Sequence, residues 1–424
     1  MSFSVKEDFA DLSGENGKAF MKQKLKIVPT ILGQDLGAYS VAKAFYDAFH
    51  VKSYAFGRYK CGISDFSRII KIEFCSGYES IDRLLPELIS FAKKKHGKIL
   101  VLVPATDAYV EFISKNRREL EKYYKFLIPD EHLLKKLTDK GEFYKTISEF
   151  GIDFPEYTLL SEGDNYAKKL AKIDYPLVLK PSVSAEYWRH PFPGMKKVYY
   201  PQNRDEAGNT VAALRYYGYG EGIILQKFIK NAEIYVYTAL YNKRSECDFG
   251  VFGKVVLEEV GETSSGNHSA IITEERCEIT EKLDKLLFGI GYTGFANFDI
   301  LKADGKFYVL ELNARQGRSC DYIRCAGVNI AERLLFALGI VDYGGRRDYE
   351  KIFWHYPTLR VCMKYMSGKD KREAKRLKKA KRAFSALSYK RDLLLNPRRA
   401  SYVLFHSRRL GRKFKKDYSS LRSV

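Results

Sequence analysis

The chain has 424 residues, of which 45% are hydrophobic, and its formal net charge is +21 at pH 7. This length is typical of about three domains, and this composition excludes a wholly disordered chain. No run approaches the roughly 18 apolar residues of a membrane span, and residues 1–20 lack the apolar run of a secretory signal. The seven cysteines form no Cys-x-x-Cys pair, so neither a zinc site nor a disulfide framework is expected. We therefore expect a cytoplasmic protein.

The first third of the chain alternates strands with helices. Buried strands are predicted at Lys26–Leu32, Val51–Phe56 and Lys98–Val103, with helices at Ala38–Phe49 and Ala108–Tyr123. This alternation predicts a parallel, doubly wound α/β sheet. The first turn, Gly33-Gln-Asp-Leu-Gly37, lacks the Gly-x-Gly-x-x-Gly dinucleotide fingerprint, so we interpret the domain as substrate-binding or structural.

The middle of the chain reads as two further α/β units. A helix is predicted at Leu137–Phe150, ended by Gly151 and Pro155, and another at Glu278–Phe288. The predicted strands are Leu177–Lys180, Gly222–Phe228, Glu233–Tyr241, Gly250–Leu257, Gly294–Leu301 and Lys306–Asn313.

The last two of these strands form a predicted hairpin around Asp304-Gly305. Glu311 and Asn313 are two residues apart and share a face of their strand. A plain two-residue turn would put Asp299 on the opposite face, so we predict a three-residue turn or a bulge at Gly305 that returns Asp299 to the face of Glu311. Three oxygen ligands on one sheet face suit Mg²⁺. A solvated hairpin face is the alternative, but the apolar neighbours of Glu311 favour a buried carboxylate that needs a cation.

Two lysines are candidate phosphate ligands. Lys180 closes an apolar strand, where its charge is costly unless an anion meets it, although a snorkelling side chain is the alternative. Lys140 precedes a helix and is the weaker candidate. The loop from Pro181 to Lys197 could fold over phosphates as a lid, or its aromatic residues could serve packing.

The segment Gln226–Ile229, at the end of the strand Gly222–Phe228, is a candidate adenine site. The backbone of Gln226, Lys227 and Ile229 could read the adenine edge, and Glu233 could accept the ribose hydroxyls. An ordinary strand junction is the alternative.

Two arginines follow the hairpin. Arg315 lies two residues after Asn313, on the predicted metal face, where its planar fork suits an acyl phosphate or a substrate carboxylate. Arg318 is a second candidate for the same role. The sequence does not identify a general base. His268 is the histidine nearest to the predicted site.

Taken in order, these segments resemble the ATP-grasp superfamily, in which Asp139-Lys140, Gly151–Pro155, Pro176–Pro181, the Gln226–Glu233 hinge and Asp299…Glu311-x-Asn313 have counterparts. Gln226 replaces the acid that usually begins the hinge. Three further segments, Pro29–Tyr39, Gly291–Asp299 and Asn313–Ser319, look like the D-aspartate ligases of Gram-positive bacteria. This likeness covers nearly the whole chain, including a basic C-terminal end. The loop after Lys180 and the tail depart from it, which leaves the acceptor open.

The resemblance implies an ATP-dependent carboxylate–amine ligase that acts through an acyl phosphate. Asp299, Glu311 and Asn313 would hold two Mg²⁺ ions, with Mn²⁺ as an alternative metal, and Lys140 and Lys180 would contact the ATP phosphates. D-Aspartate would be joined to the lysine amine of a peptidoglycan precursor. The alternatives are a ligase for another amino acid or small carboxylate, and a non-catalytic basic protein associated with a membrane or a nucleic acid.

The resemblance also implies a division of the chain. Residues 1–24 would be an N-terminal extension, 25–128 a Rossmann-like pre-ATP-grasp domain, 129–229 the small lobe and 230–350 the large metal-binding lobe of an ATP-grasp fold. Residues 351–424 would be a basic helical tail.

Positive charge is concentrated in that tail. From Arg360 onward there are 22 Lys or Arg and 4 Asp or Glu, a net charge of +18. Apolar residues at spacings of three and four predict an amphipathic helix over Lys369–Leu387. It could be a docked helix with solvated charges, an attachment to anionic lipid at the inner face of the membrane, or a site for the diphosphate of a nucleotide-linked precursor. Nucleic acid is not expected, because no nucleic-acid motif is present.

Overall fold

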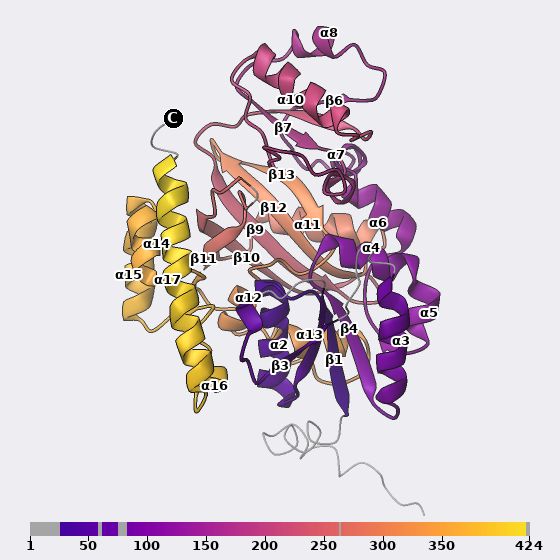
Figure 1. The fold of residues 1–424 in the computed structure, drawn as a ribbon, viewed down its shortest axis with the longest axis vertical. Coiled ribbons are helices and arrows are strands. Elements are labelled where there is room, and N and C mark those ends of the chain that lie inside the picture. Colours follow the sequence, from indigo (N-terminus) through magenta and orange to yellow (C-terminus); the bar gives the residue numbers. More distant parts are fainter. Residues whose placement is uncertain (1–25, 58–61, 75–82, 263, 421–424) are drawn as a thin grey trace, which may run out of the picture.

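The structure is a computed structural model, and it describes residues 26–57, 62–74, 83–262 and 264–420. The predicted N-terminal extension at 1–24 lies outside these residues. Three sheets follow one another along the chain: a five-stranded sheet, a three-stranded sheet and a seven-stranded sheet. Figure 1 shows the three-stranded sheet at the top, the seven-stranded sheet in the middle and the five-stranded sheet below. The predicted α/β fold class is confirmed.

The five-stranded sheet is parallel throughout, as predicted. In spatial order its strands are β3 (Ile70–Phe74), β2 (Ser53–Gly57), β1 (Ile27–Leu32), β4 (Ile99–Pro104) and β5 (Tyr124–Lys125). Its helices are α2 (Leu36–Phe49), α3 (Leu84–Lys94), α4 (Asp107–Lys115) and α5 (Arg117–Glu121), with a short 3-10 turn at Gly62–Ser64. The helix predicted at Ala108–Tyr123 is interrupted at Asn116, whose side-chain amide donates to the carbonyl of Phe112 and competes with the helical ladder.

The strand order reverses on either side of β1, which has β2 on one side and β4 on the other. The loops that follow β1 and β4 therefore open a crevice at the carboxyl edge of the sheet, where ligands bind in folds of this kind. Asp35 ends the first loop and caps α2, because its Oδ1 accepts from the amide of Ala38 at 3.0 Å. Asp107 begins α4 after the second loop.

The small lobe is built on three antiparallel strands. They lie in the order β6 (Tyr157–Leu160), β8 (Ile223–Lys227) and β7 (Leu177–Pro181). Its helices are α8 (Tyr166–Leu170), α9 (Ser184–Tyr187) and α10 (Arg204–Tyr216). Two helices, α6 (Glu131–Thr138) and α7 (Lys140–Ser148), precede it.

The single helix predicted over Leu137–Phe150 is wrong, because the chain breaks at Asp139. The Asp139 side chain accepts from the amide of Glu142 at 2.9 Å and caps α7. This cap starts α7 at Lys140, so the lysine stands on the first turn of the helix.

The large sheet runs β13 (Lys306–Asn313), β12 (Gly294–Ala303), β9 (Glu233–Tyr241), β10 (Cys247–Glu258), β11 (His268–Glu274), β14 (Phe353–His355) and β15 (Ala383–Ser385). The associated helices are α11 (Glu278–Gly289), α12 (Asp321–Cys325) and α13 (Ile330–Ala337). A buried ion pair, Lys43 Nζ to Asp321 Oδ2 at 2.6 Å, ties α2 to α12. The five-stranded domain is thereby fixed against the large sheet rather than loosely tethered to it.

The hairpin between β12 and β13 has a different turn from the predicted one. Ala303 pairs with Lys306, so the turn consists of Asp304 and Gly305 alone, with φ values of 50° and 77°. Two positive φ values define the type I′ turn that Asp-Gly favours. The extra residue lies further along, at Leu310, where a bulge shifts the register between Ile300–Val309 and Asp299–Glu311. Asp299 therefore shares a face with Glu311, as predicted, but for another reason.

The tail is helical for most of its described length but includes two strands of the large sheet, β14 and β15. Its helices are α14 (Leu359–Tyr365), α15 (Gly368–Lys379), α16 (Lys390–Leu393) and α17 (Pro397–Ser420). The helix predicted to reach Leu387 stops at Lys379. Lys381 adopts φ 60°, and the amide of Arg382 donates to the carbonyl of Leu377, which is a Schellman ending. Phe384 then pairs with Trp354 in the large sheet.

Buried polar contacts dock the tail on the body. Asp392 accepts from the hydroxyl of Tyr39 at 2.7 Å and pairs with Arg399 Nε at 3.2 Å, and all three residues are buried. Leu410 and Phe414 bury the inner face of α17. Figure 1 shows α17 (yellow) running along one edge of the molecule beside α14 and α15. Within the described residues, no helix is both long and apolar enough to cross a membrane.

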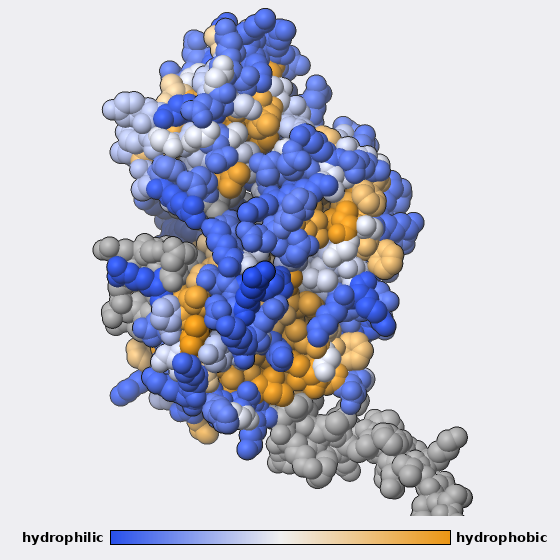
Figure 2. Space-filling view, turned by 90° about the vertical axis from the view of Figure 1, so that its right-hand side faces the viewer, coloured by the Kyte–Doolittle hydropathy of each residue, from blue (hydrophilic) through white to orange (hydrophobic). Residues whose placement is uncertain are grey.

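Figure 2 views the molecule from the side on which Figure 1 places α3 and α5. The small lobe at the top is narrower than the body, and an indentation separates the two. Hydrophilic residues dominate this face, with hydrophobic areas on the body. The indentation lies between the small lobe and the body of the molecule.

Candidate active site

A cavity of about 380 Å³ lies between the small sheet and the large sheet. Lys180 and Gln226 reach it from β7 and β8, and Asp299 and Glu311 reach it from β12 and β13. Ile229, in the segment that joins β8 to β9, also lines it. The structure thus brings together candidate residues that are up to 131 positions apart in the sequence.

The two carboxylates stand opposite each other. Asp299 is the register partner of Glu311 across β12 and β13, and Asn297 is the partner of Asn313 two residues away. Burial and then the neighbouring Glu311 carboxylate raise the pKa of Asp299 well above its usual range. Burial would also raise the pKa of Glu311, but Lys140, Lys197 and Lys180 outweigh it and hold that pKa below its usual range. Two acids so close together favour a bound cation.

The two candidate lysines approach Glu311 from the small-lobe side. Lys140 Nζ lies 3.5 Å from Glu311 Oε2 and donates to Ser184 Oγ at 3.2 Å. Burial lowers the pKa of Lys180 to about 8, against the opposing pull of Glu311 and Asp299. A buried ammonium that is only partly compensated is suited to receive a further anion.

One tyrosine hydroxyl connects these groups. Tyr144 donates to the carbonyl of Leu310, the bulge residue, at 2.8 Å. It accepts from Lys180 Nζ at 3.3 Å and from Gln226 Nε2 at 3.1 Å. Burial raises the pKa of Tyr144 far above the physiological range, so the hydroxyl keeps its proton. It therefore fixes the strand bulge, the lysine and the hinge glutamine relative to one another.

A second cavity, of about 360 Å³, lies on the other side of Glu311. Asn313 and Arg315 line it together with Lys140. Arg315 donates to Asp107 Oδ2 at 2.8 Å and to Asn313 Oδ1 at 3.2 Å. Its buried Nε has no hydrogen-bond partner in the described part of the chain. Arg315 is thus oriented by the loop after β4 and retains a donor for a ligand.

Three candidates are placed less directly. Glu233 does not line the cavity, because its Oε1 pairs with Lys254 Nζ at 2.6 Å. Lys227 lines the cavity but is exposed, and its Nζ lies 3.7 Å from Glu156. Arg318 lines a separate cavity of about 700 Å³ and donates to Glu259 at 3.1 Å. The structure therefore separates Arg318 from Arg315, although they are only three positions apart in the sequence.

Sequence patterns did not single out several residues that the structure brings into the site. Lys197 lines both cavities beside Glu311, and its amide donates to the carbonyl of Glu262, which ties the loop from Pro181 to the large sheet. The aromatic Tyr187 in this loop is buried and serves packing. Only the basic end of the loop hinted at Lys197, and Tyr144 carried no such signal.

His268 lies close to the carboxylates. Its Nε2 is 3.8 Å from both Asp299 Oδ1 and Glu258 Oε1. Burial lowers its pKa, although Glu258 opposes the shift. The neutral imidazole is therefore favoured beside the acids.

The residues at the hairpin fit a hard divalent cation. The donors are two carboxylates and one amide oxygen on adjacent strands, which is the set that Mg²⁺ prefers when water and phosphate complete its shell. The described residues contain no cluster of three or more His, Cys, Asp or Glu that could hold a metal ion, so the set at the hairpin depends on Asn313 as its third protein donor. Burial and, after it, the Glu311 carboxylate raise the pKa of Asp299, and a bound cation would offset both effects.

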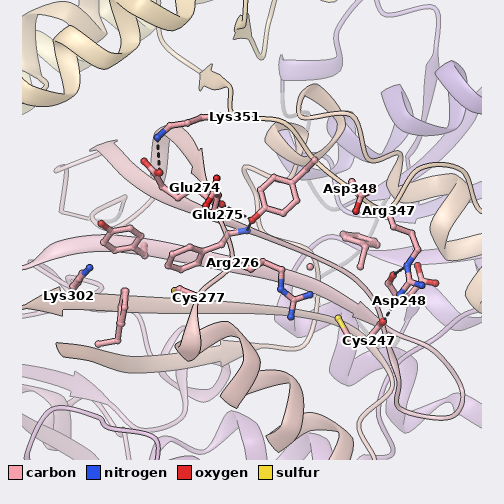
Figure 3. Close-up of a pocket in the computed structure, with 16 residues that line it drawn as sticks. Cys247, Asp248, Glu274, Glu275, Arg276, Cys277, Lys302, Arg347, Asp348 and Lys351 are labelled. Carbon is pink, nitrogen blue, oxygen red and sulfur yellow. Dashed lines mark hydrogen bonds and ion pairs between the residues drawn. The ribbon is translucent and has the colours of Figure 1, made fainter. Parts of the chain in front are cut away.

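Another cavity, of about 1090 Å³, lies elsewhere, on the opposite face of the large sheet. Tyr235 and Lys302 line it, and they point away from their neighbours Ile234 and Leu301, which line the cavity of Asp299. Figure 3 shows that charged side chains of this cavity already have partners. Lys351 forms an ion pair with Glu274, and Arg347 donates a hydrogen bond to the backbone carbonyl of Asp248. This cavity lacks the converging lysines and carboxylates of the site described above.

Comparison with known proteins relates part of the chain to a known domain family. Residues 137–319 match the family described as the ATP-grasp domain. The fold is also that of the biotin carboxylase domain of Hydrogenobacter thermophilus 2-oxoglutarate carboxylase, solved with MgADP, ADP and bicarbonate, with a TM-score of 0.59 at 16% identity over 78% of this chain and 74% of that one. Phosphoribosylamine–glycine ligase of Thermotoga maritima gives a TM-score of 0.56 at 16% identity over 77% and 78%. Residues 137–319 therefore carry an ATP-grasp domain, and the chain shares the fold of these two enzymes.

A closer relative narrows this class. The chain is 25% identical over 399 residues to the D-aspartate ligase of Enterococcus faecium, a match that covers 90% of this chain and 95% of that protein. Both expected resemblances, to the ATP-grasp superfamily and to the D-aspartate ligases, are confirmed. The chain is an ATP-dependent ligase of the kind that forms carbon–nitrogen bonds.

Proposed function

We propose that the chain converts the carboxylate of an amino acid into an acyl phosphate and transfers the acyl group to an amine. D-Aspartate is the proposed amino acid. The observation that supports the chemistry is the pair Asp299 and Glu311, facing each other between Lys140 and Lys180. The observation that supports the substrate is the similarity to a D-aspartate ligase over nine tenths of the chain.

In this proposal ATP occupies the cavity between the two sheets. Gln226 and the backbone up to Ile229 contact the adenine, and Lys140 and Lys180 contact the phosphates. Asp299, Glu311 and Asn313 would hold Mg²⁺, with two ions in the full complex. The bound metal would neutralise charge on the ATP phosphates. For Glu233 to bind the ribose, its contact with Lys254 must open.

The reaction then has two steps. An oxygen of the amino-acid carboxylate attacks the γ-phosphorus, the bond to the β-phosphate oxygen breaks, and ADP leaves. The amine nitrogen next attacks the acyl carbon, phosphate leaves, and the nitrogen loses a proton. Arg315, which faces the second cavity beside Asn313, is placed to stabilise the charge of the acyl phosphate.

We propose a peptidoglycan precursor as the amine acceptor, used in the cytoplasm. The outward face of α17 supports a place at the inner face of the membrane. Leu404 and Phe405 are 54% and 62% exposed, and Leu395, just before the helix, is 83% exposed. Exposed cations continue this face: Arg408, Arg412, Lys415 and Lys416. Apolar side chains beside a basic cluster suit an anionic lipid surface.

The test is Mg²⁺-dependent ADP release from ATP with a panel of D- and L-amino acids, with hydroxylamine present to trap the acyl phosphate. We expect D-aspartate to stimulate release most, and chelation of the metal to abolish it. Stimulation by a different small carboxylate alone would replace the proposed substrate. No stimulation by any carboxylate would refute the proposed chemistry.

A further inference from the structure

The cavity of about 360 Å³ beside Glu311 contains an acid that the proposed chemistry does not use. Glu111 lines this cavity from α4, one helical turn after Asp107, so the two carboxylates lie on the same side of the helix. Asp107 is paired with Arg315 at 2.8 Å. Glu111 is half-buried and forms neither an ion pair nor a hydrogen bond with any residue that the structure describes. One carboxylate of this cavity therefore has no cationic partner in the described part of the chain.

The other charged groups of the cavity define its end toward ATP. Glu311 and Lys197 line this cavity and also the cavity proposed for ATP, so they stand where the two cavities meet. Lys140 lies 3.5 Å from Glu311 at the same end. Glu111 lines the cavity of about 360 Å³ and not the cavity proposed for ATP. The unpaired acid is thus set apart from the groups proposed to act on the phosphates.

The surroundings of Glu111 disfavour its negative charge. Burial raises the pKa of Glu111 above its usual range, although Lys115 and Arg189 oppose the shift. Lys115 is exposed at the end of α4, and Arg189 is paired with Glu186 at 2.7 Å. A carboxylate that loses water without gaining a close cation is stabilised by a cationic ligand.

A ligand that suits these groups has a carboxylate at one end and a positive charge at the other. The carboxylate that reacts must lie toward ATP, beside Glu311 and Lys197. The buried Nε of Arg315, which has no hydrogen-bond partner among the described residues, is a further donor to a negative group. An amino acid has this distribution of charge in one small molecule. The volume of the cavity lies near the lower end of the range of about 300–1,000 Å³ for small-molecule sites.

We propose that Glu111 binds the ammonium group of the amino-acid substrate and thereby selects amino acids over carboxylic acids that lack this group. This inference rests on the proposed function and adds a residue that determines specificity. The reacting carboxylate lies toward Glu311, and the ammonium group lies against α4. A dicarboxylic acid of the same length without the ammonium group leaves Glu111 without a partner.

The test compares two charge-matched variants of the full-length protein. Glu111→Gln removes the proposed contact, and Glu119→Gln removes one negative charge from the exposed surface of α5. Titration calorimetry measures the binding of D-aspartate and of succinate, which lacks the ammonium group, with Mg²⁺ and a non-hydrolysable ATP analogue present. We expect Glu111→Gln to weaken the binding of D-aspartate by roughly tenfold or more and to leave that of succinate unchanged or stronger. Glu119→Gln should change neither, and both variants should bind the ATP analogue as the unaltered protein does.

Unchanged binding of D-aspartate in Glu111→Gln, or an equal loss for D-aspartate and succinate, overturns the proposal. An equal loss in both variants also overturns it, because the effect then comes from net charge. Loss of the ATP analogue in Glu111→Gln assigns the residue a structural role and has the same consequence.

ADP release by the unaltered protein is measured in parallel. Its absence with every carboxylate contradicts the proposed function, whereas the role of Glu111 is decided by the calorimetry, so the two failures are distinguishable. If another amino acid stimulates ADP release most, the same comparison uses that amino acid and its analogue without the ammonium group. The absence of amino-acid binding in the unaltered protein also overturns the proposal.

Discussion

Asp299 in β12 lies directly opposite Glu311 in β13, although the turn that joins these strands has only two residues. The bulge at Leu310 supplies the extra residue that brings both carboxylates to one face. The carbonyl of Leu310 is in turn held by the hydroxyl of Tyr144. A contact between α7 and the large sheet therefore supports the geometry of the proposed metal site.

We predict that Asp299→Asn and Glu311→Gln each lower kcat for ADP release by at least about a hundredfold, because each removes a proposed Mg²⁺ ligand. Without metal the Asp299→Asn protein should melt at the same or a higher temperature, because the raised pKa of Asp299 means that its charge opposes folding near neutral pH. Thermal melting with and without Mg²⁺ checks this, since the variants should lose the stabilisation by the metal. Full activity in either variant would refute the metal assignment.

Tyr144→Phe should remove three hydrogen bonds at once and cost about 1–3 kcal/mol of folding free energy. It should also raise KM for ATP, because Lys180 and Gln226 lose a common anchor. Tyr157→Phe is the control, since its ring packs 4.8 Å from that of Tyr144 but its hydroxyl makes no hydrogen bond within the described residues. Urea unfolding and ATP kinetics of both variants test this. Equal effects would mean that the anchor has no special role.

Lys180 and Lys227 were both candidate ATP ligands, and the structure separates them by burial. Lys180→Met should reduce kcat/KM for ATP by roughly 10- to 100-fold, because a charge-assisted contact is worth about 1.5–3 kcal/mol. Lys227→Met should change it by less than about threefold, as expected for an exposed ion pair. Steady-state kinetics at varied ATP decide the point. A larger loss in the Lys227 variant would place the phosphates elsewhere.

Arg315 and Arg318 should differ in their effect on the formation of the acyl phosphate. Arg315→Gln should abolish acyl-phosphate trapping by hydroxylamine, because Arg315 faces the cavity beside Glu311. Arg318→Gln should leave trapping within about threefold, because Arg318 lines a separate cavity and is paired with Glu259. Loss of trapping in the Arg318 variant would show that both arginines act on the acyl phosphate.

The outer face of α17 gives a separate prediction about location. Replacing Arg408, Arg412, Lys415 and Lys416 by Gln should abolish flotation with anionic vesicles, because each charge near such a surface contributes about 1 kcal/mol. If the unaltered protein does not bind the vesicles at moderate salt, the membrane proposal fails.

Local signals predicted the elements that long apolar runs define, such as β1, β4, β9 and the hairpin β12–β13. They missed β15, because its three residues continue the spacing of three and four that precedes them, and only the ending at Lys381 and the pairing with β14 reveal a strand. The local sequence signals also failed to predict the short strand β3 and the break in the helix at Asp139.

Local sequence signals predicted only part of the candidate site as well. Motif order led to Lys180, Glu311 and Asn313, because each stands in a distinctive strand. Tyr144 and Lys197 have no local motif, and only the packing of α7 and of the loop after β7 places them beside the carboxylates. The bulge at Leu310 depends on long-range hydrogen bonding. The requirement that Asp299 and Glu311 share a face therefore predicted an extra residue in the hairpin, but it did not predict the position of that residue.

Oxygen-isotope transfer tests the central claim, acyl-phosphate formation from an amino-acid carboxylate, most directly. D-Aspartate labelled with oxygen-18 in both carboxylates is incubated with ATP, Mg²⁺ and hydroxylamine, and the released phosphate is analysed by mass spectrometry. We predict ADP together with phosphate that carries one oxygen-18 atom, because the carboxylate oxygen that attacks the γ-phosphorus leaves with it. Unlabelled phosphate, or AMP with pyrophosphate, would contradict the account.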